Sequence, residues 1–207
     1  MVDLSIDAAG QLVAYLELSN VAPFASKASH FAVYNNRAGV PSLTAYPSAF
    51  PGQYTVGAGD VSVGTGPVGG SPGDTSYDIT VIGPNRFLRR YIGDTEAAGA
   101  DVWVEATYYD RDQHGHDCDA RDAQPKLKLL LRNDGKKAVT FTITFNNYCS
   151  RSHESVKVKA HGREEWTLDA CRDADGWYDL TVTVSNDSSW SQRLTGHVET
   201  GRASVSG

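Results

Sequence analysis

Apolar and polar residues alternate along several short segments of the chain. In residues 11–20 (QLVAYLELSN), every second residue from Leu12 to Leu18 is aliphatic or alanine, and the residues between them include Tyr15 and Glu17. The same alternation recurs in residues 125–133 (PKLKLLLRN). A period of two is typical of a β-strand with one face against a core. Both segments are therefore predicted to be half-buried strands.

Matching segments occur in the same order in the two halves of the chain, which indicates an internal duplication. Two of them end in an aromatic residue followed by Asn-Asn, two share Tyr-Asp followed by alternating apolar residues, and two contain a glycine, at positions 93 and 196. The matched pairs are QLVAYLELSN with PKLKLLLRN, HFAVYNN with FTITFNN, SYDITV with WYDLTV, and RRYIGDTE with QRLTGHVE.

Each copy spans roughly 85 to 100 residues, with turn residues about every ten positions, a spacing typical of an antiparallel sandwich. We therefore predict an all-β fold of two tandem immunoglobulin-like antiparallel β-sandwiches. Residues 1–110 are assigned to the first sandwich and residues 125–207 to the second. Residues 111–124 form an acidic linker in this interpretation, because domain boundaries usually fall in polar segments.

Composition and charge exclude several classes of protein. The chain has 19 basic and 25 acidic residues and a net charge of −6, so we expect no nucleic-acid partner. Its apolar runs are far shorter than the roughly 18 to 20 residues of a membrane-spanning helix, so no transmembrane segment is expected. The GxSxG, HExxH and P-loop motifs do not occur in the sequence. We expect no active site in this chain.

Glycines 64, 66 and 69 match the dinucleotide-binding pattern GxGxxG. That pattern requires a helix directly after it, and the next residues, from Gly70 to Gly73, include Pro72. A flexible hairpin loop is the better interpretation.

Residues 110–122 (DRDQHGHDCDARD) concentrate carboxylates, imidazoles and a thiol. Oxygen and imidazole ligands at this density can hold a metal ion, but a calcium loop would need a glutamate at its last position and a zinc site would need a fourth ligand. A solvated acidic linker is the favoured alternative, and no cofactor is expected. The candidate metal ligands are Asp110, Asp112, His114 and His116.

Two of the three cysteines are expected at the same end of the second sandwich. FTITFNN and REEWTLDA run in the same direction and end just before Cys149 and Cys171. In an exported protein we predict a disulfide between them, closing a loop of about 20 residues and contributing about 3 kcal/mol. Cys118 is left over.

The first copy has a longer connection after its Asn-Asn pair. It is RAGVPSLTAYPSAFPGQ (residues 37–53), where the second copy has only YCSRSHE. Loops of sandwiches carry function, and a proline-stiffened loop loses less entropy on binding. Tyr46, Phe50 and Tyr54 are the candidate ligand or membrane contacts. The alternative, that this loop packs on the core or on a neighbouring domain, stays open.

The repeated motifs resemble the C-terminal domain found, usually in tandem, in bacterial phosphocholine-preferring phospholipases C of hemolytic and non-hemolytic type. The resemblance lies in the Tyr-Asn-Asn of residues 34–36, in GWYDLTV (176–182) and in the closing GHVETGRASVSG (196–207). The first copy departs from the family by having Gly-Asp-Thr-Glu at residues 93–96 in place of Gly-His-Val-Glu.

The resemblance implies a secreted or periplasmic phospholipase C whose N-terminal catalytic domain hydrolyses phosphatidylcholine or sphingomyelin. That domain is absent from this chain, so the chain is expected to be a non-catalytic accessory region. It would aid substrate or membrane recognition or stabilise the catalytic domain, with the catalytic domain and choline phospholipid surfaces as partners. The alternative is a carbohydrate-binding or cell-surface adhesion module, for which the candidates are Trp103, Trp166, Trp177 and Trp190.

Overall fold

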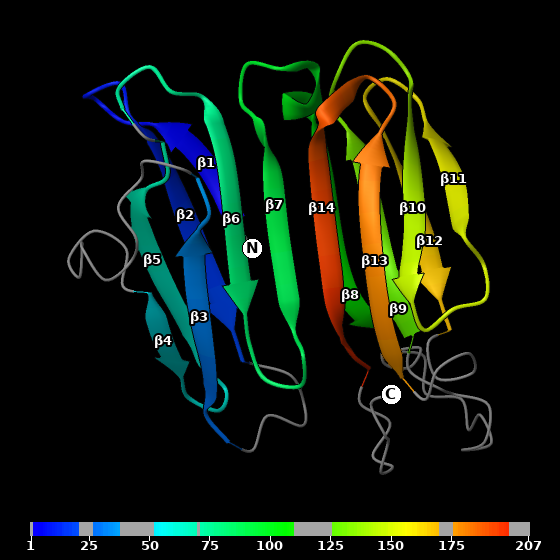
Figure 1. Ribbon diagram of the computed structural model, residues 1–207, viewed down its shortest axis with the longest axis horizontal. Coiled ribbons are helices and arrows are strands. Elements are labelled where there is room, and N and C mark those ends of the chain that lie inside the picture. The colour runs from blue at the N-terminus through cyan, green and yellow to red at the C-terminus, as the bar shows by residue number, and fades with distance from the viewer. Residues whose placement is uncertain are drawn as a thin grey trace. The chain divides into compact units, whose positions relative to one another are not determined.

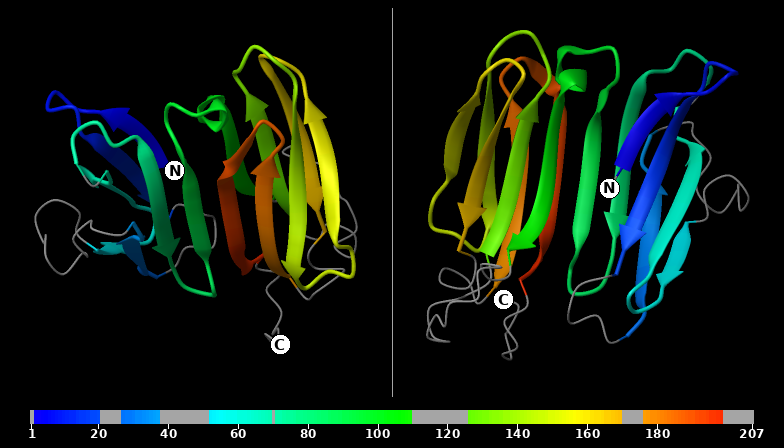
Figure 2. Two further views of the ribbon diagram at one scale, coloured as in Figure 1. Left: turned by 45° about the horizontal axis from the view of Figure 1, so that its top comes forward. Right: turned by 180° about the vertical axis from the view of Figure 1, so that it is seen from behind.

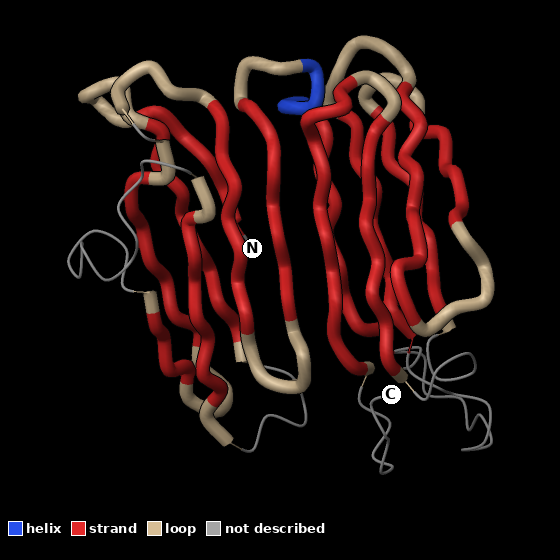
Figure 3. Tube along the Cα trace, viewed as in Figure 1, coloured by secondary structure: helices blue, strands red, loops and turns tan. Residues whose placement is uncertain are grey.

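The computed structural model describes residues 2–20, 27–37, 52–69, 71–109, 126–169 and 176–198. These residues form fourteen β-strands and one short 3-10 helix (Ala98–Asp101), which precedes β8 (Figure 3). The chain divides into two compact units. Unit 1 comprises Met1–Ala100 with Ser189–Ser191, and unit 2 comprises Asp101–Ser188 with Gln192–Gly207.

Unit 1 contains two antiparallel sheets, with strand orders β1-β2-β5 and β4-β3-β6-β7, which form its two layers (Figure 1 and Figure 2). Their facing sides bury alternate apolar residues, such as Leu16 from one sheet and Ile79 from the other. The strands are β1 (Val2–Ile6), β2 (Leu12–Ser19), β3 (Ser29–Asn35), β4 (Gln53–Val56), β5 (Val61–Pro67), β6 (Ser76–Ile82) and β7 (Leu88–Asp94).

Unit 2 repeats this topology strand for strand, with orders β8-β9-β12 and β11-β10-β13-β14. Strands β8 to β14 take the places of β1 to β7, which confirms the all-β fold, the tandem sandwiches and the duplication predicted from sequence. The strands are β8 (Val102–Tyr109), β9 (Lys126–Asn133), β10 (Val139–Asn147), β11 (His153–Val158), β12 (Gly162–Leu168), β13 (Trp177–Val184) and β14 (Asp187–His197).

The division between the units differs from the sequence-based assignment. Strand β8 pairs with β9 along its whole length, from Val102 to Tyr109, so it is the first strand of unit 2 and not the last of unit 1. The acidic segment 111–124 lies outside the described residues, between two strands of the same unit. A polar connection between paired strands has the same composition as a linker between domains, so composition could not distinguish the two.

A tyrosine lies against a glycine of the neighbouring strand in both units. Tyr77 of β6 is opposite Gly93 of β7, and a Cβ atom built on Gly93 would lie 2.5 Å from Tyr77 Oη. On β13 and β14, a Cβ atom on Gly196 would lie 2.6 Å from Tyr178 Oη. These are the glycines shared by RRYIGDTE and QRLTGHVE, and they leave room for the tyrosine ring of the adjacent strand.

We expect Gly196→Ala to lower the free energy of unfolding by roughly 1–3 kcal/mol, the usual cost of overpacking a core. The Tyr178 ring is 1% exposed and has little room to move away from the new methyl group. Urea denaturation measures the loss. The Tyr178→Phe variant lacks Oη, the atom nearest to the added methyl group, so Gly196→Ala should lower the free energy of unfolding by a smaller amount in that background. An equal cost in both backgrounds would contradict the steric explanation.

Candidate functional site

A polar network on the outward face of the four-stranded sheet ties β6 and β7 of unit 1 to the end of β3. Arg90 donates from Nε to Asp78 Oδ1 at 2.9 Å and from Nη2 to Asp78 Oδ2 at 2.6 Å. Asn36 Nδ2 donates to Asp78 Oδ1 at 2.9 Å and to Thr80 Oγ1 at 2.7 Å. Bidentate arginine–carboxylate pairs of this kind are among the strongest and most directional hydrogen bonds in proteins.

Unit 2 contains the same network around Asp179. Arg193 donates from Nε and Nη2 to the two carboxylate oxygens at 3.0 and 2.8 Å. Asn146 Nδ2 donates to Asp179 Oδ1 at 2.8 Å and to Thr181 Oγ1 at 2.9 Å, and Asn147 Nδ2 donates to Asp179 Oδ2 at 3.2 Å. Asparagines of the Asn-Asn pairs and the aspartates of the Tyr-Asp dipeptides therefore connect neighbouring strands in both units.

The two carboxylates are held in their ionised form. Burial alone would raise the pKa of Asp179, but the hydrogen bonds from Arg193, Asn146 and Asn147 outweigh it and hold that pKa below its usual value. The pKa of Asp78 is lowered in the same way, with burial opposed by the hydrogen bonds from Arg90 and Asn36. A carboxylate with a lowered pKa is ionised near neutral pH, so both groups are available as hydrogen-bond acceptors for the surrounding arginine and asparagine donors.

We expect Asp179→Asn to lower the free energy of unfolding at pH 7 by roughly 2 kcal/mol, because Arg193 would lose a charged acceptor. The folded-state pKa is depressed, so the contribution of Asp179 is complete above the unfolded pKa of about 3.9 and is lost as pH falls through the folded pKa. The difference in free energy of unfolding between wild type and Asp179→Asn should therefore become smaller as the pH is lowered from about 5 to about 2, as measured by urea denaturation at each pH.

Asp134→Asn is the matched control for this titration. Asp134 pairs with Arg132 at 2.8 Å, but both side chains are more than half exposed, so its removal should cost less than about 1 kcal/mol. A difference between wild type and Asp179→Asn that does not change with pH would contradict the role given to the carboxylate.

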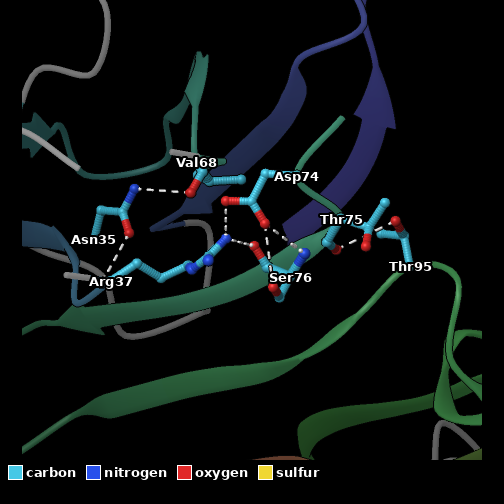
Figure 4. Close-up of polar contacts among 7 residues, drawn as sticks. All are labelled: Asn35, Arg37, Val68, Asp74, Thr75, Ser76 and Thr95. Atoms are coloured by element: carbon cyan, nitrogen blue, oxygen red, sulfur yellow. Dashed lines mark hydrogen bonds and ion pairs between the residues drawn. The ribbon is translucent and has the colours of Figure 1, made fainter. Parts of the chain in front are cut away.

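The connection from β3 to β4, which contains the candidate contact loop, is anchored at both ends. Arg37 forms an ion pair with Asp74 and donates to the Ser76 carbonyl at 2.6 Å, and Figure 4 shows its side chain reaching from the end of β3 to these residues. At the other end, the Gly52 carbonyl accepts a hydrogen bond from the Val33 amide at 2.8 Å. Tyr46 and Phe50 lie outside the described residues.

Tyr54 belongs to the core and not to the contact surface for which it was a candidate. Its side chain is 7% exposed and packs within the apolar core of unit 1. The reason is the alternation of β4, whose burial pattern directs Tyr54 and Val56 inward and Gln53 and Thr55 outward. Burial raises the pKa of Tyr54, and its Oη has no hydrogen-bond partner among the described residues.

The glycine-rich segment near residue 64 is a strand, which corrects its interpretation as a flexible hairpin loop. Gly64 and Gly66 lie in β5. A Cβ atom on Gly64 would overlap the ring of Tyr54, so the missing side chain makes room for that ring. The signal available in the sequence was the alternation of Val61, Val63 and Thr65 with small residues.

We expect Tyr54→Phe to be as stable as wild type or up to about 1 kcal/mol more stable, because it removes a buried hydroxyl without a partner. Thermal or urea denaturation measures this. A loss of more than about 1 kcal/mol would show that the hydroxyl makes an interaction in the folded protein.

Most of the other predicted site residues lie outside the part of the chain that the structure describes. Asp110, Asp112, His114 and His116 lie outside the described residues, as does Cys171, while Cys149 is half-buried just after β10. The predicted metal site and disulfide therefore stay predictions. Within the described ranges there is no group of three or more His, Cys, Asp or Glu side chains placed to hold a metal ion. No helix in those ranges is long and apolar enough to span a membrane.

The tryptophans do not form an exposed platform for sugars. Trp166 and Trp190 are 8% and 5% exposed, and Trp103 and Trp177 are half-buried. Stacking on a carbohydrate requires an open ring face. All four rings lie in described strands, so this arrangement gives no support to the carbohydrate-binding alternative.

The fold defines a class, a tandem pair of immunoglobulin-like sandwiches of identical topology. A family model described as bacterial phospholipase C, C-terminal domain, matches residues 2–94 and again residues 105–197. The chain belongs to this family and carries its domain twice.

Two curated relatives carry names that agree with this family. The chain is 38% identical over 133 residues to the non-hemolytic phospholipase C of Burkholderia pseudomallei, covering 63% of this chain and 17% of that protein. It is 35% identical over 137 residues to the hemolytic phospholipase C of Pseudomonas aeruginosa, covering 63% of this chain and 16% of that protein. The aligned part of the chain thus spans about a sixth of the length of these relatives.

A solved structure of Amycolatopsis orientalis exo-chitosanase CsxA is similar over 90% of this chain and 25% of its own, at 16% identity and a TM-score of 0.28. A score this low supports no conclusion about function.

Proposed function

We propose that this chain is the non-catalytic C-terminal accessory region of an exported, phosphocholine-preferring phospholipase C. The observation that carries the proposal is the double match to the family of C-terminal domains, together with two relatives named phospholipase C. The polar groups that the two units share, Asp78 with Arg90 and Asp179 with Arg193, pair across neighbouring strands. In this proposal, hydrolysis belongs to the part of the enzyme that precedes this region.

In this proposal the region helps the catalytic domain to find or hold a surface of phosphatidylcholine or sphingomyelin outside the cytoplasm. The segment assigned to lipid contact is the β3–β4 loop, because the first copy carries it and the second does not. The support is its anchored base, where Arg37 binds Asp74 and Gly52 pairs with Val33. An anchored base lowers the entropy lost when a loop binds.

Tyr46 and Phe50 are the proposed contact residues. Aromatic rings can lie at the lipid–water interface or stack on the ammonium group of choline. Simple attraction to anionic lipid is not part of the proposal, because it needs clusters of Lys and Arg and the chain carries a net charge of −6.

We expect the wild-type chain to co-sediment with vesicles of phosphatidylcholine or sphingomyelin, and Tyr46→Ala with Phe50→Ala to weaken this binding about tenfold or more. The basis is the loss of two aromatic contacts of roughly 1 kcal/mol each. Phosphatidylglycerol vesicles and a polysaccharide panel test the specificity.

Tyr34→Ala is the matched control for the loop substitutions. Tyr34 is 45% exposed on the outward face of β3, so its removal deletes an aromatic ring without touching the loop. Its binding should equal that of wild type. Unchanged binding in the Tyr46 and Phe50 double variant would remove this loop from the proposal, and failure of the wild-type chain to bind choline lipid would remove lipid recognition from it.

A further inference from the structure

The outward face of the three-stranded sheet of unit 1 carries exposed apolar side chains on β2 and β5, with the polar residues Glu17, Ser19 and Thr65 among them. Tyr15 of β2 and Val61 and Val63 of β5 are 39%, 50% and 56% exposed. The register pairs Ser19 with Val61 and Glu17 with Val63, and it places all of these side chains on the side away from the core. The apolar β2–β5 face consists of Val13, Tyr15, Val61, Val63 and Pro67.

One asparagine in each unit shows which positions of the two units are equivalent. Asn20, just after β2, donates to the carbonyls of Val56 and Gly57 at the end of β4. Asn133 of β9 donates in the same way to the carbonyls of Val158 and Lys159 at the end of β11. Asn20 and Asn133 are therefore equivalent, which aligns β2 with β9 residue by residue.

The equivalent face of unit 2 is charged. Counting back from the two asparagines, Tyr15 corresponds to Lys128 of β9. The registers of β2–β5 and β9–β12 then match Val61 to Arg163 and Val63 to Glu165. Lys128 and Glu165 form an ion pair across the strands, with Nζ and Oε2 2.8 Å apart.

The sheet itself does not require apolar residues at these positions, because unit 2 builds the same strands with charged ones. Valine favours strands in general, and single exposed valines are ordinary. Here, however, the valines lie on β5, an edge strand of a sheet ordered β1-β2-β5. An exposed apolar edge strand promotes aggregation unless something covers it, and charges on the edge are the usual protection, as on β12.

We propose that the apolar β2–β5 face docks against the catalytic part of the same polypeptide. This inference rests on the proposed function, in which a catalytic part precedes these domains. The relatives extend far beyond the aligned 16–17% of their length, and the matched family is a C-terminal domain, so most of such an enzyme lies before this region. The first family match includes β1, which is the other edge strand of the same sheet.

The chemistry of the face favours a protein over a lipid surface. Its apolar members are aliphatic apart from the single aromatic ring of Tyr15, and the polar side chains among them are those of Glu17, Ser19 and Thr65. Among the described outward residues of β2 and β5 there is no lysine or arginine. Attraction to anionic lipid needs basic residues, and contact with a neutral lipid interface uses several aromatic rings, whereas apolar patches bordered by polar residues are typical of protein contacts.

Nitration of tyrosine tests the proposal within one chain. Tetranitromethane is applied to the 207-residue chain and to the complete phospholipase, and peptides are quantified by mass spectrometry. We expect Tyr15 to react at least tenfold more slowly in the complete enzyme than in the chain. Tyr34, 45% exposed on the outward face of the other sheet, normalises the comparison.

Three results would overturn docking on the catalytic part. Equal reactivity of Tyr15 in both proteins would show that the face stays open. If protection of Tyr15 from nitration in the 207-residue chain increases with the concentration of that chain, the partner is a second copy. Protection of the complete enzyme only after addition of phosphatidylcholine vesicles would make the partner a membrane.

A transplant of the unit 2 residues gives a second measurement. The variant carries Tyr15→Lys, Val61→Arg and Val63→Glu, residues that the equivalent strands already accommodate. In the complete enzyme we expect hydrogen exchange in residues 61–67 to rise to its level in the chain alone. The control variant, Arg163→Val with Glu165→Val on β12, should leave hydrogen exchange in residues 61–67 unchanged. The proposal is contradicted if this exchange rises only in the control variant, or if it does not rise in the transplant variant.

The same transplant separates this inference from the lipid proposal. It leaves the β3–β4 loop intact, so vesicle binding by the 207-residue chain should equal that of wild type. Docking and lipid recognition are thus read from different experiments, and either can fail without the other.

Discussion

Each unit depends on burying one side of two facing sheets. A strand divides its residues between two faces by alternation, so the inward residues, such as Leu16 and Ile79 in unit 1 and Leu129 and Leu180 in unit 2, have to be apolar. Neither sheet could bury that side alone. This requirement applies equally to both copies and explains why strand order and inward pattern are the same in them, whereas the outward faces are free to differ.

The strings that identify the family serve this architecture. Asparagine from the Asn-Asn pair, the aspartate of the Tyr-Asp dipeptide and the downstream arginine form a hydrogen-bonded network across three strands around Asp78, and again around Asp179. The glycines at 93 and 196 leave room for tyrosine rings. Their chemistry is that of cross-strand attachment, in which an ionised carboxylate is worth most when several donors surround it.

Functional differences between the units are therefore to be sought where the copies diverge. One such place is the β3–β4 connection, which is long in unit 1 and short in unit 2. The other is the outward face of β5, where Val61 and Val63 occupy the positions of Arg163 and Glu165 in β12. A duplicated domain can keep charged outward residues in one copy while the other copy carries apolar ones, because outward residues contribute little to the core.

The sequence by itself determined the all-β class, the duplication and the family, because these follow from alternation, from the order of matched segments and from recognisable motifs. Only the tertiary structure decided that Tyr54 is a core residue, that Gly64 lies in a strand beside it, and that β8 opens the second unit. It also showed that Tyr15, Val61 and Val63 share one exposed face. Local patterns show which residues of one strand lie on the same side, but pairing between strands far apart in sequence decides which face is covered.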